Sequence, residues 1–452
     1  MGAAGAPFNF QTPPLFQVIV ALFFKLFGRN DFLMALISIT FSCLTIFILY
    51  HLGKMLYSEE VGLYAITFFV TSEYFLFFSQ SGLSDATFTF FSTSSLFLFL
   101  RALRSNRTRD FWIAGLLTAF CLYTKYSAAP IIVTFLIIGI LNRYAINRHW
   151  FVTTIVLPLI IFVPYISSFL FTVSPIEIGV RHIPLLGLNH LKYAYYLLIF
   201  APVPFVHALI HTCFGRWRHD KFAVYLLIAV IVFFVVLGFY HPYFRLAYPL
   251  VPLLSIFAGS LVASLGKSKY YIVAISIFAS LMLSLGTLRY TTKTPRDVAS
   301  IVDRYTITKD TAYIYSLTPP NIYFYINGEI AVPSTHPWYR MGKRFPWLLR
   351  NRLILEKETN VLSNEKRILL VHATVFDTFK DEYPNVYDKA TLVDNIDYED
   401  APVYYKDIFN PLRNTQQSYE FYLLSEKDIL QCLDQLWNLG FEREVKVIYV
   451  AP

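Results

Sequence analysis

Long apolar runs with very few charges make up residues 1–290, and this feature restricts the possible folds more than any other. Only 27 of these 290 residues are Lys, Arg, Asp or Glu, whereas the remaining 162 residues contain 41. Soluble domains are about 25% charged, so the first part has the composition of a membrane protein and the second that of a soluble domain. This division excludes a purely cytosolic enzyme, a disordered chain and a disulfide-rich secreted fold.

The apolar runs have the length of transmembrane helices. A helix crosses about 30 Å of hydrocarbon with roughly 20 residues. Ten runs are predicted to span: 32–56, 61–78, 86–103, 111–125, 129–142, 150–172, 193–214, 222–240, 246–266 and 270–289. The earlier run 13–28 is shorter and contains Lys25, so we expect a helix that lies in the membrane interface.

The basic residues of the short loops predict the orientation. Alternate loops near 54–60, 101–110, 143–149, 215–221 and 267–269 contain 12 Lys and Arg, while the intervening loops contain 4. Lys and Arg collect on the cytoplasmic side, so the intervening loops and everything after residue 290 are predicted to lie outside. The net charge of +8 therefore reflects topology, and no nucleic-acid partner is expected.

The fold class follows from these patterns. We expect a mainly α protein, a polytopic transmembrane helical bundle of about ten spans over residues 1–290, in the cell membrane. Residues 291–452 are expected to form an extracytoplasmic α/β domain. In that tail, strands are predicted at TAYIYSL, RILLVHA and EVKVIYVA, and helices at RDVASIVDRY and SEKDILQCLDQLWNLG.

The same topology has a consequence at the start of the chain. Ten spans with the tail outside also place residue 1 outside, and the first twelve residues contain nothing that would carry them across. We therefore expect the natural protein to begin earlier, with one more span.

Three ionisable residues stand at the outer ends of three predicted spans. They are Asp85 in SQSGLSDATFTFF, Lys125 in CLYTKYSAAP and Arg245 in YHPYFRLAYPLVP. A charge at membrane depth costs about 2.5–3.5 kcal/mol on insertion scales, so it is a candidate for function. One such charge would more often be an interfacial anchor. Three charged residues at one membrane level, where the outer loops otherwise contain few charges, predict a polar cavity that opens outward.

Other polar residues point less clearly to a site. Arg181 and His182 lie in the longest outer loop, and Glu73 lies within the span 61–78. His207 and His211 share one helix face at a spacing that could hold a metal, but no acidic third ligand follows nearby. No CxxC motif and no Cys/His cluster has zinc spacing.

Four blocks resemble the C-type membrane glycosyltransferases, the superfamily of protein O-mannosyltransferases and aminoarabinose transferases, in their prokaryotic branch. NFQTPPLFQVIVALFFKLFG resembles the first-loop motif, with Pro13 and Pro14 opening the interfacial helix. SQSGLSDATFTFF resembles the second outer block, with Asp85 at its acidic position. GLLTAFCLYTKYSAAP resembles the Thr-Lys block, and HPYFRLAYPLVPLL the late block of Arg245, Tyr248 and two prolines.

The resemblance implies an activity. A sugar on a polyprenyl phosphate would be transferred at the outer membrane face to an acceptor hydroxyl, with inversion. Lys125 and Arg245 would stabilise the phosphate leaving group. Asp85 would orient the acceptor or bind a divalent metal ion together with a second acid. Gln80, Arg181, His182, Tyr248, Pro13 and Pro14 would contribute to substrate binding.

The sequence departs from the branch in two places. The principal first-loop acid of the family, its expected base, would lie upstream of the PPL segment, but no Asp or Glu precedes Asp31. The branch often has Arg five residues before its second acid, where this chain has Gln80. Gln80 can donate hydrogen bonds to a phosphate or a sugar but brings no charge.

We predict a membrane glycosyltransferase that uses a polyprenyl-phosphate-linked sugar and a protein, lipid or glycan acceptor, among membrane lipids. Two alternatives stay open. A transporter or lipid flippase would show matched halves with broken helices, which are not evident in the sequence. A noncatalytic membrane scaffold would tolerate replacement of all three charged residues.

Overall fold

A computed structural model describes the chain over most of the helical part and over short stretches of the tail. The described residues are 13–28, 30–142, 149–172, 189–214, 220–239, 244–288, 313–316, 329–332, 353–355, 366–372, 380, 384–396 and 419–425. Contacts divide the chain into two compact units, one spanning Phe8–Tyr290 and one containing Thr291–Pro452. Each unit is described by itself.

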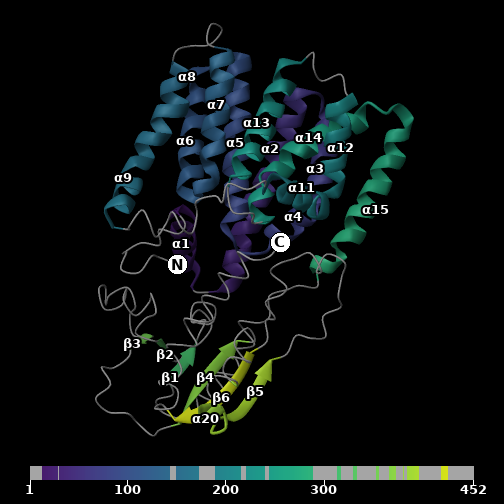
Figure 1. Cartoon of the computed structure of the whole chain (residues 1–452). Helices are drawn as coiled ribbons and strands as arrows, with labels where there is room; N and C mark the ends of the chain where they lie inside the picture. The colour runs from purple at the N-terminus through teal and green to yellow at the C-terminus, as the bar shows by residue number, and fades with distance from the viewer. Residues whose placement is uncertain are drawn as a thin grey trace. The chain divides into compact units, whose positions relative to one another are not determined.

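The first unit is a helical bundle (Figure 1). Its longer helices are α1 (Leu15–Phe27), α2 (Asp31–Leu56), α3 (Glu59–Val70), α5 (Ser84–Ser105), α6 (Thr108–Thr124), α7 (Ala129–Leu141), α9 (Leu157–Thr172), α11 (Asn189–Phe200), α12 (Pro202–Phe214), α13 (Lys221–Leu237), α14 (Leu250–Ala263) and α15 (Lys269–Leu288). The short elements are α4 (Glu73–Phe78), η1 (Tyr126–Ala128), α8 (His149–Phe151), the π-helix η2 (Val152–Val156), and the 3-10 turns η4 (Phe244–Ala247) and η5 (Gly266–Ser268).

Every predicted span contains helix, but two of the spans are broken. The run 61–78 was expected as one helix and forms α3 and α4. Ser72 causes the break, because its extended backbone starts α4 and its hydroxyl oxygen accepts a hydrogen bond from the N–H of Phe75 at 3.3 Å. The run 193–214 forms α11 and α12, which are bent by 117° just before Pro202.

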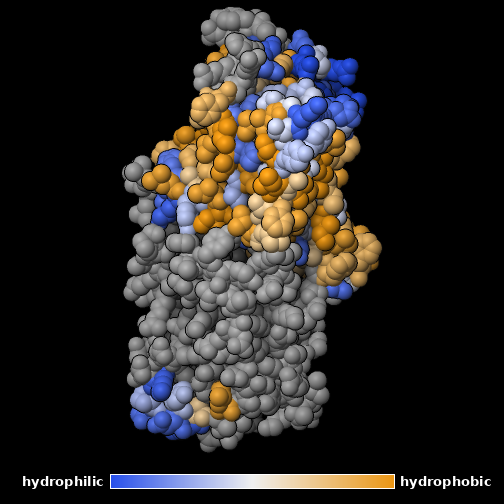
Figure 2. All heavy atoms as spheres, turned by 90° about the vertical axis from the view of Figure 1, so that its right-hand side faces the viewer, coloured by the Kyte–Doolittle hydropathy of each residue, from blue (hydrophilic) through white to orange (hydrophobic). Residues whose placement is uncertain are grey.

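Length and hydropathy identify membrane-crossing candidates among these helices. Within the described residues, Phe32–Leu56, Ser84–Ser105 and His149–Ser167 are long and apolar enough to cross a membrane, and the bent pair α11 and α12 is a further candidate. Figure 2 shows one face of the first unit, where hydrophobic side chains cover a broad area and hydrophilic ones gather at one end. Such a surface is typical of a protein that contacts lipid.

Helices α5 and α6 form an antiparallel hairpin that contains the centre of the candidate site. Asn106 turns the chain between them in the left-handed conformation, at φ 53°. In the middle of the hairpin the Ser95 hydroxyl donates to the carbonyl of Ala114 at 2.8 Å, and its oxygen lies 2.6 Å from that of Thr118. Because lipid offers no hydrogen bonds, such contacts hold neighbouring helices together.

An ion pair closes each end of this hairpin. At the turn, the Arg101 guanidinium donates two hydrogen bonds to the Asp110 carboxylate, at 2.9 and 2.7 Å. At the open end, Lys125 donates to Asp85. The two pairs compensate four of the charged side chains of the hairpin.

The second unit contains a six-stranded mixed sheet. Its strands are β1 (Tyr313–Ser316), β2 (Glu329–Val332), β3 (Leu353–Leu355), β4 (Lys366–His372), β5 (Thr391–Ile396) and β6 (Tyr419–Ser425), in the order β3-β2-β1-β4-β6-β5. The β3-β2-β1-β4 part is parallel, and β6 is antiparallel to both of its neighbours. The one described helix of this unit is the short α20 (Pro384–Tyr387).

The strands β1 and β4 lie where TAYIYSL and RILLVHA predict them. The other four strands were not predicted; β2 and β3 have only four and three residues, whereas β5 and β6 have six and seven. The two predicted tail helices, apart from Ser425 at the end of β6, and the strand EVKVIYVA lie outside the described residues.

Candidate functional site

The centre of the candidate site is a buried ion pair between two helix ends. Asp85 lies in the first turn of α5, where a negative charge is favoured by the helix dipole. Lys125 caps the end of α6, and its extended backbone, at φ −152° and ψ 142°, turns the chain away from the helix. Nζ of Lys125 donates to Oδ1 of Asp85, and the two side chains are 9% and 2% exposed. Burial at this level is tolerated because the charges are paired.

Arg245 joins this pair from a third element. It lies in the 3-10 turn η4, partly buried, and its positive charge acts on that of Lys125. The ring of Phe88, one turn from Asp85 on α5, lies 6.0 Å from Nζ of Lys125. The structure therefore brings Asp85, Lys125 and Arg245 together from α5, α6 and η4, with an excess of one positive charge.

Several buried polar atoms around the ion pair are unsatisfied by protein. Within the described part of the chain, Oδ2 of Asp85 and the hydroxyls of Thr89 and Ser127 have no hydrogen-bond partner. Tyr248 is fully buried, and its phenol is close enough to Asp85 for the two to interact electrostatically. Buried polar groups are normally paired, so this set of atoms is suited to binding a polar ligand or water.

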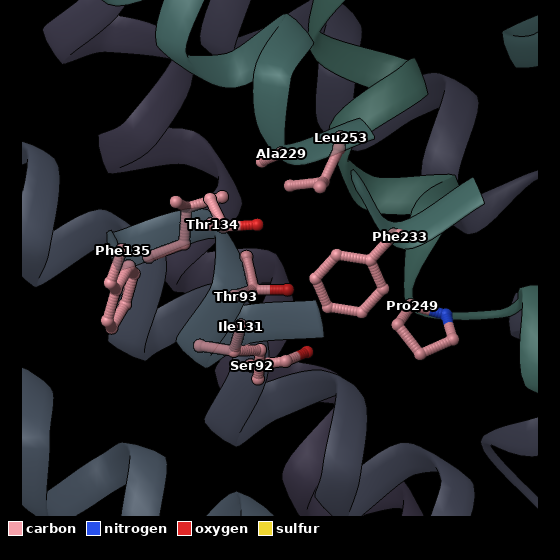
Figure 3. Close-up of a pocket in the computed structure, with 10 residues that line it drawn as sticks. Ser92, Thr93, Ile131, Thr134, Phe135, Ala229, Phe233, Pro249 and Leu253 are labelled. Carbon is pink, nitrogen blue, oxygen red and sulfur yellow. The ribbon is translucent and has the colours of Figure 1, made fainter. Parts of the chain in front are cut away.

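A small cavity lies further along α5 (Figure 3). It is enclosed by α5, α7, α13 and α14, and its volume is about 10 Å³. The hydroxyls of Thr93 and Thr134 point into this space, and neither has a hydrogen-bond partner among the residues described. The volume is near the lower limit for one water molecule, so the cavity is far too small for a sugar.

The remaining predicted site residues lie at separate places. Pro14 precedes α1, Pro13 is buried next to it, and Gln80 is exposed in the turn after α4. Arg181 and His182 lie outside the described residues. Glu73 is 7% exposed in the first turn of α4.

The donor set near Asp85 does not fit a metal ion. One oxygen of Asp85 is paired with Lys125. Among the described residues, no three His, Cys, Asp or Glu side chains come together as ligands. His207 and His211 do share a helix face, but Nδ1 of His207 lies 2.9 Å from the carbonyl oxygen of Val203. We therefore derive no step through a metal.

Sequence reasoning missed one part of the site, an aromatic cluster around η4. Tyr74, Phe78, Phe244 and Tyr248 stack with ring centroids 4.8 to 6.4 Å apart. The signal that could have indicated burial is the pairing of Tyr74 and Phe78 at i, i+4 directly after the polar Thr71-Ser72 break.

Comparison with known proteins agrees with the motif resemblance. Residues 11–167 match the family model described as dolichyl-phosphate-mannose-protein mannosyltransferase. No curated protein matches the sequence. The chain thus has a recognisable family signature over its first third, which includes the first three of the four motif blocks.

The solved structures extend the likeness over most of the chain. ArnT from Cupriavidus metallidurans in the apo state superposes with a TM-score of 0.64 at 11% identity, over 93% of this chain and 88% of that one. The same protein bound to undecaprenyl phosphate superposes with a TM-score of 0.60 at 12% identity, over 92% of this chain and 88% of that one. An oligosaccharyltransferase from Archaeoglobus fulgidus in complex with Zn and sulfate superposes with a TM-score of 0.52 at 12% identity, over 71% of this chain and 54% of that one.

The chain therefore shares the fold of ArnT, and the resemblance predicted from the motif blocks is confirmed by the family model over residues 11–167 and by this fold.

Proposed function

We propose that this protein is a membrane glycosyltransferase that transfers a sugar from a polyprenyl phosphate to an acceptor hydroxyl, with inversion, at the outer membrane face. The observation that supports this most directly is the buried Asp85–Lys125 pair with Arg245 beside it. Two cations suit the negative charge of the leaving phosphate, and one acid suits the proton that the acceptor hydroxyl loses. The ArnT fold supports the donor class, because one ArnT structure contains undecaprenyl phosphate.

The chemistry assigns one task to each side chain. The acceptor oxygen attacks the anomeric carbon while the bond between that carbon and the phosphate oxygen breaks. The phosphate gains negative charge as it leaves, and Lys125 and Arg245 stabilise it, Arg245 through two N–H groups. The proton of the acceptor hydroxyl passes to Oδ2 of Asp85, the carboxylate oxygen that has no partner within the described residues.

The proposed architecture places this site outside. The ten helical runs cross the membrane, the basic loops face the cytoplasm, and residues 291–452 form an extracytoplasmic α/β domain. Gln80 and Tyr248 contact the substrate, as do Arg181 and His182, while Pro13 and Pro14 start the interfacial helix next to it. The sugar is a hexose or pentose, and the acceptor is a protein, a lipid or a glycan.

The activity is tested in vesicles that contain the purified full chain and a panel of polyprenyl-phosphate sugars with candidate acceptors. Release of free polyprenyl phosphate reports transfer whatever the acceptor. Asp85→Asn, Lys125→Met and Arg245→Gln are each expected to lower the rate by roughly 10²- to 10³-fold, because each removes a charge at the reacting atoms.

The matched control is Lys269→Met. Lys269 also donates to a carboxylate, that of Glu60, but this pair joins the start of α3 to the start of α15. It should leave the rate unchanged. Normal rates in all three site variants would disprove the assignment, and solute uptake without release of polyprenyl phosphate would favour a transporter.

A further inference from the structure

The turn that carries Arg245 is contacted by the short helix α4 through a hydrogen bond. The Oη of Tyr74 on α4 donates a hydrogen bond of 2.8 Å to the carbonyl of Phe244. That carbonyl belongs to the peptide unit that joins Phe244 to Arg245. Tyr74 is 1% exposed, and the hydrogen bond is part-buried.

Aromatic rings hold the residues on both sides of Arg245. The ring of Phe244 lies 5.8 Å from Phe78 and 5.4 Å from Phe200. The ring of Tyr248, three residues after Arg245, lies 4.8 Å from Phe78 and 5.9 Å from Tyr74. Aromatic pairs at these distances contribute about 0.5–1.5 kcal/mol each beyond their burial.

The backbone of the turn completes this support. The N–H of Tyr248 donates to the carbonyl of Arg245 at 3.3 Å, which closes the 3-10 turn. Arg245 is partly buried, whereas Tyr74, Phe78 and Tyr248 are buried. Its guanidinium is thus carried by a turn that residues of α4 support.

The break at Ser72 makes this arrangement possible. A continuous helix over 61–78 would carry Tyr74 onward along the axis of α3. Instead, the Ser72 hydroxyl donates to the carbonyl of Phe69 at 2.6 Å, and α4 starts in a new direction. Tyr74 then reaches the segment 244–248, which lies 170 residues away in the sequence.

We propose that Tyr74 is a positioning residue: by holding the Phe244–Arg245 peptide, it fixes the orientation of Arg245 toward the phosphate of the donor. This inference rests on the proposed function, in which Arg245 binds that phosphate. Tyr74 is not expected to touch the substrate. Its effect should therefore appear in phosphate recognition, and should disappear when Arg245 is absent.

The test measures binding of undecaprenyl phosphate and of undecaprenol to the purified full chain in detergent. The ratio of the two affinities reports phosphate recognition alone. Tyr74→Phe keeps the ring and removes only the hydroxyl, and it should weaken undecaprenyl phosphate roughly fivefold to tenfold while undecaprenol binding stays the same. In an Arg245→Gln background, Tyr74→Phe should cause no additional loss.

Tyr225→Phe is the matched control. Its Oη donates to the side chain of Asn142 at 2.6 Å, in a part-buried hydrogen bond between α13 and the end of α7. It should bind both lipids like the unmodified protein. If Tyr74→Phe prevents folding, Phe200→Leu gives a second measurement. The Phe200 ring packs on both Phe244 and Tyr74, at 5.4 and 5.5 Å, so its loss loosens the same support and should also lower the affinity ratio.

The outcomes separate the two proposals. No preference for the phosphate in the unmodified protein, or an unchanged preference in Arg245→Gln, would disprove the phosphate role of Arg245 and the inference with it. A preference that Arg245→Gln removes but Tyr74→Phe and Phe200→Leu both keep would overturn the role of Tyr74 alone. Equal losses from Tyr74→Phe with and without Arg245 would also overturn it.

Discussion

At the scale of single residues, the two oxygens of the Asp85 carboxylate differ in their contacts. Its Oδ1 is held by Lys125, and its Oδ2 has no hydrogen-bond partner within the described residues. A charge that is buried this completely needs its partner for stability. The same two residues are therefore needed both for folding and for the proposed reaction, and an activity measurement alone cannot separate these roles.

A double substitution separates them. Lys125→Met leaves the Asp85 charge buried without its ion-pair partner, so we expect it to lower the free energy of unfolding by roughly 3–5 kcal/mol. Adding Asp85→Asn removes the unpaired charge and should restore most of that stability, while sugar transfer stays lost. Thermal unfolding in detergent and release of polyprenyl phosphate measure the two effects.

The opposite result would be equally clear. If the double variant recovers transfer together with stability, the ion pair is structural and the catalytic assignment is wrong. If Lys125→Met is as stable as the unmodified protein, Lys125 does not neutralise Asp85 in the folded state.

At the scale of the elements, the packing of α6 on η2 depends on a residue without a side chain. A Cβ at Gly115 would lie 1.8 Å from the carbonyl oxygen of Thr153, a main-chain atom that cannot rotate away. The two backbones thus approach more closely than any other residue would permit. This contact holds the α8–η2–α9 segment against the hairpin that contains the site.

Gly115→Ala is therefore expected to separate η2 from α6. In a well-packed core such overpacking costs about 1–3 kcal/mol or more, and a lower unfolding temperature with a lower yield of monodisperse protein should result. Leu116→Ala, at a 42% exposed position next to it, is the control and should have little effect. An unchanged unfolding temperature in Gly115→Ala would show that the contact is absent in the protein.

The elements also show how far sequence reasoning extends. Hydropathy predicts where helices lie, because long apolar runs have few alternatives in a membrane. It does not predict the bend before Pro202 or the break at Ser72, since both follow from local hydrogen bonds and from packing partners far away in the sequence. For the same reason hydropathy predicts one membrane level for Asp85, Lys125 and Arg245. It does not predict the ion pair or the contact of Tyr74 with Phe244.

At the scale of the whole molecule, the predicted topology remains the point on which the outward-facing site depends. Twelve Lys and Arg residues in one set of loops, against four in the other, predict the hairpin turn after Ser105 in the cytoplasm and the tail outside. Cys432 in the tail and Ser105 at the turn offer two labelling positions on the predicted opposite sides.

Labelling with a membrane-impermeant thiol reagent tests this topology. In a variant with Cys43, Cys121 and Cys213 replaced by Ser, Cys432 should react in intact cells. A second variant that also has Cys432→Ser and Ser105→Cys should react only after permeabilisation, because Ser105 is exposed at the cytoplasmic end of α5. Protection of Cys432 in intact cells, or reaction of the residue at 105, would reverse the orientation and remove the outward site.

The ion pairs at both ends of the α5–α6 hairpin bear on how the protein is made. A ribosome delivers these two helices one after the other. Asp85 pairs with Lys125 and Arg101 with Asp110 inside the hairpin itself, so four of its charged side chains find their partners as soon as the two helices meet. These partners are made before α7, α13 and α14 arrive.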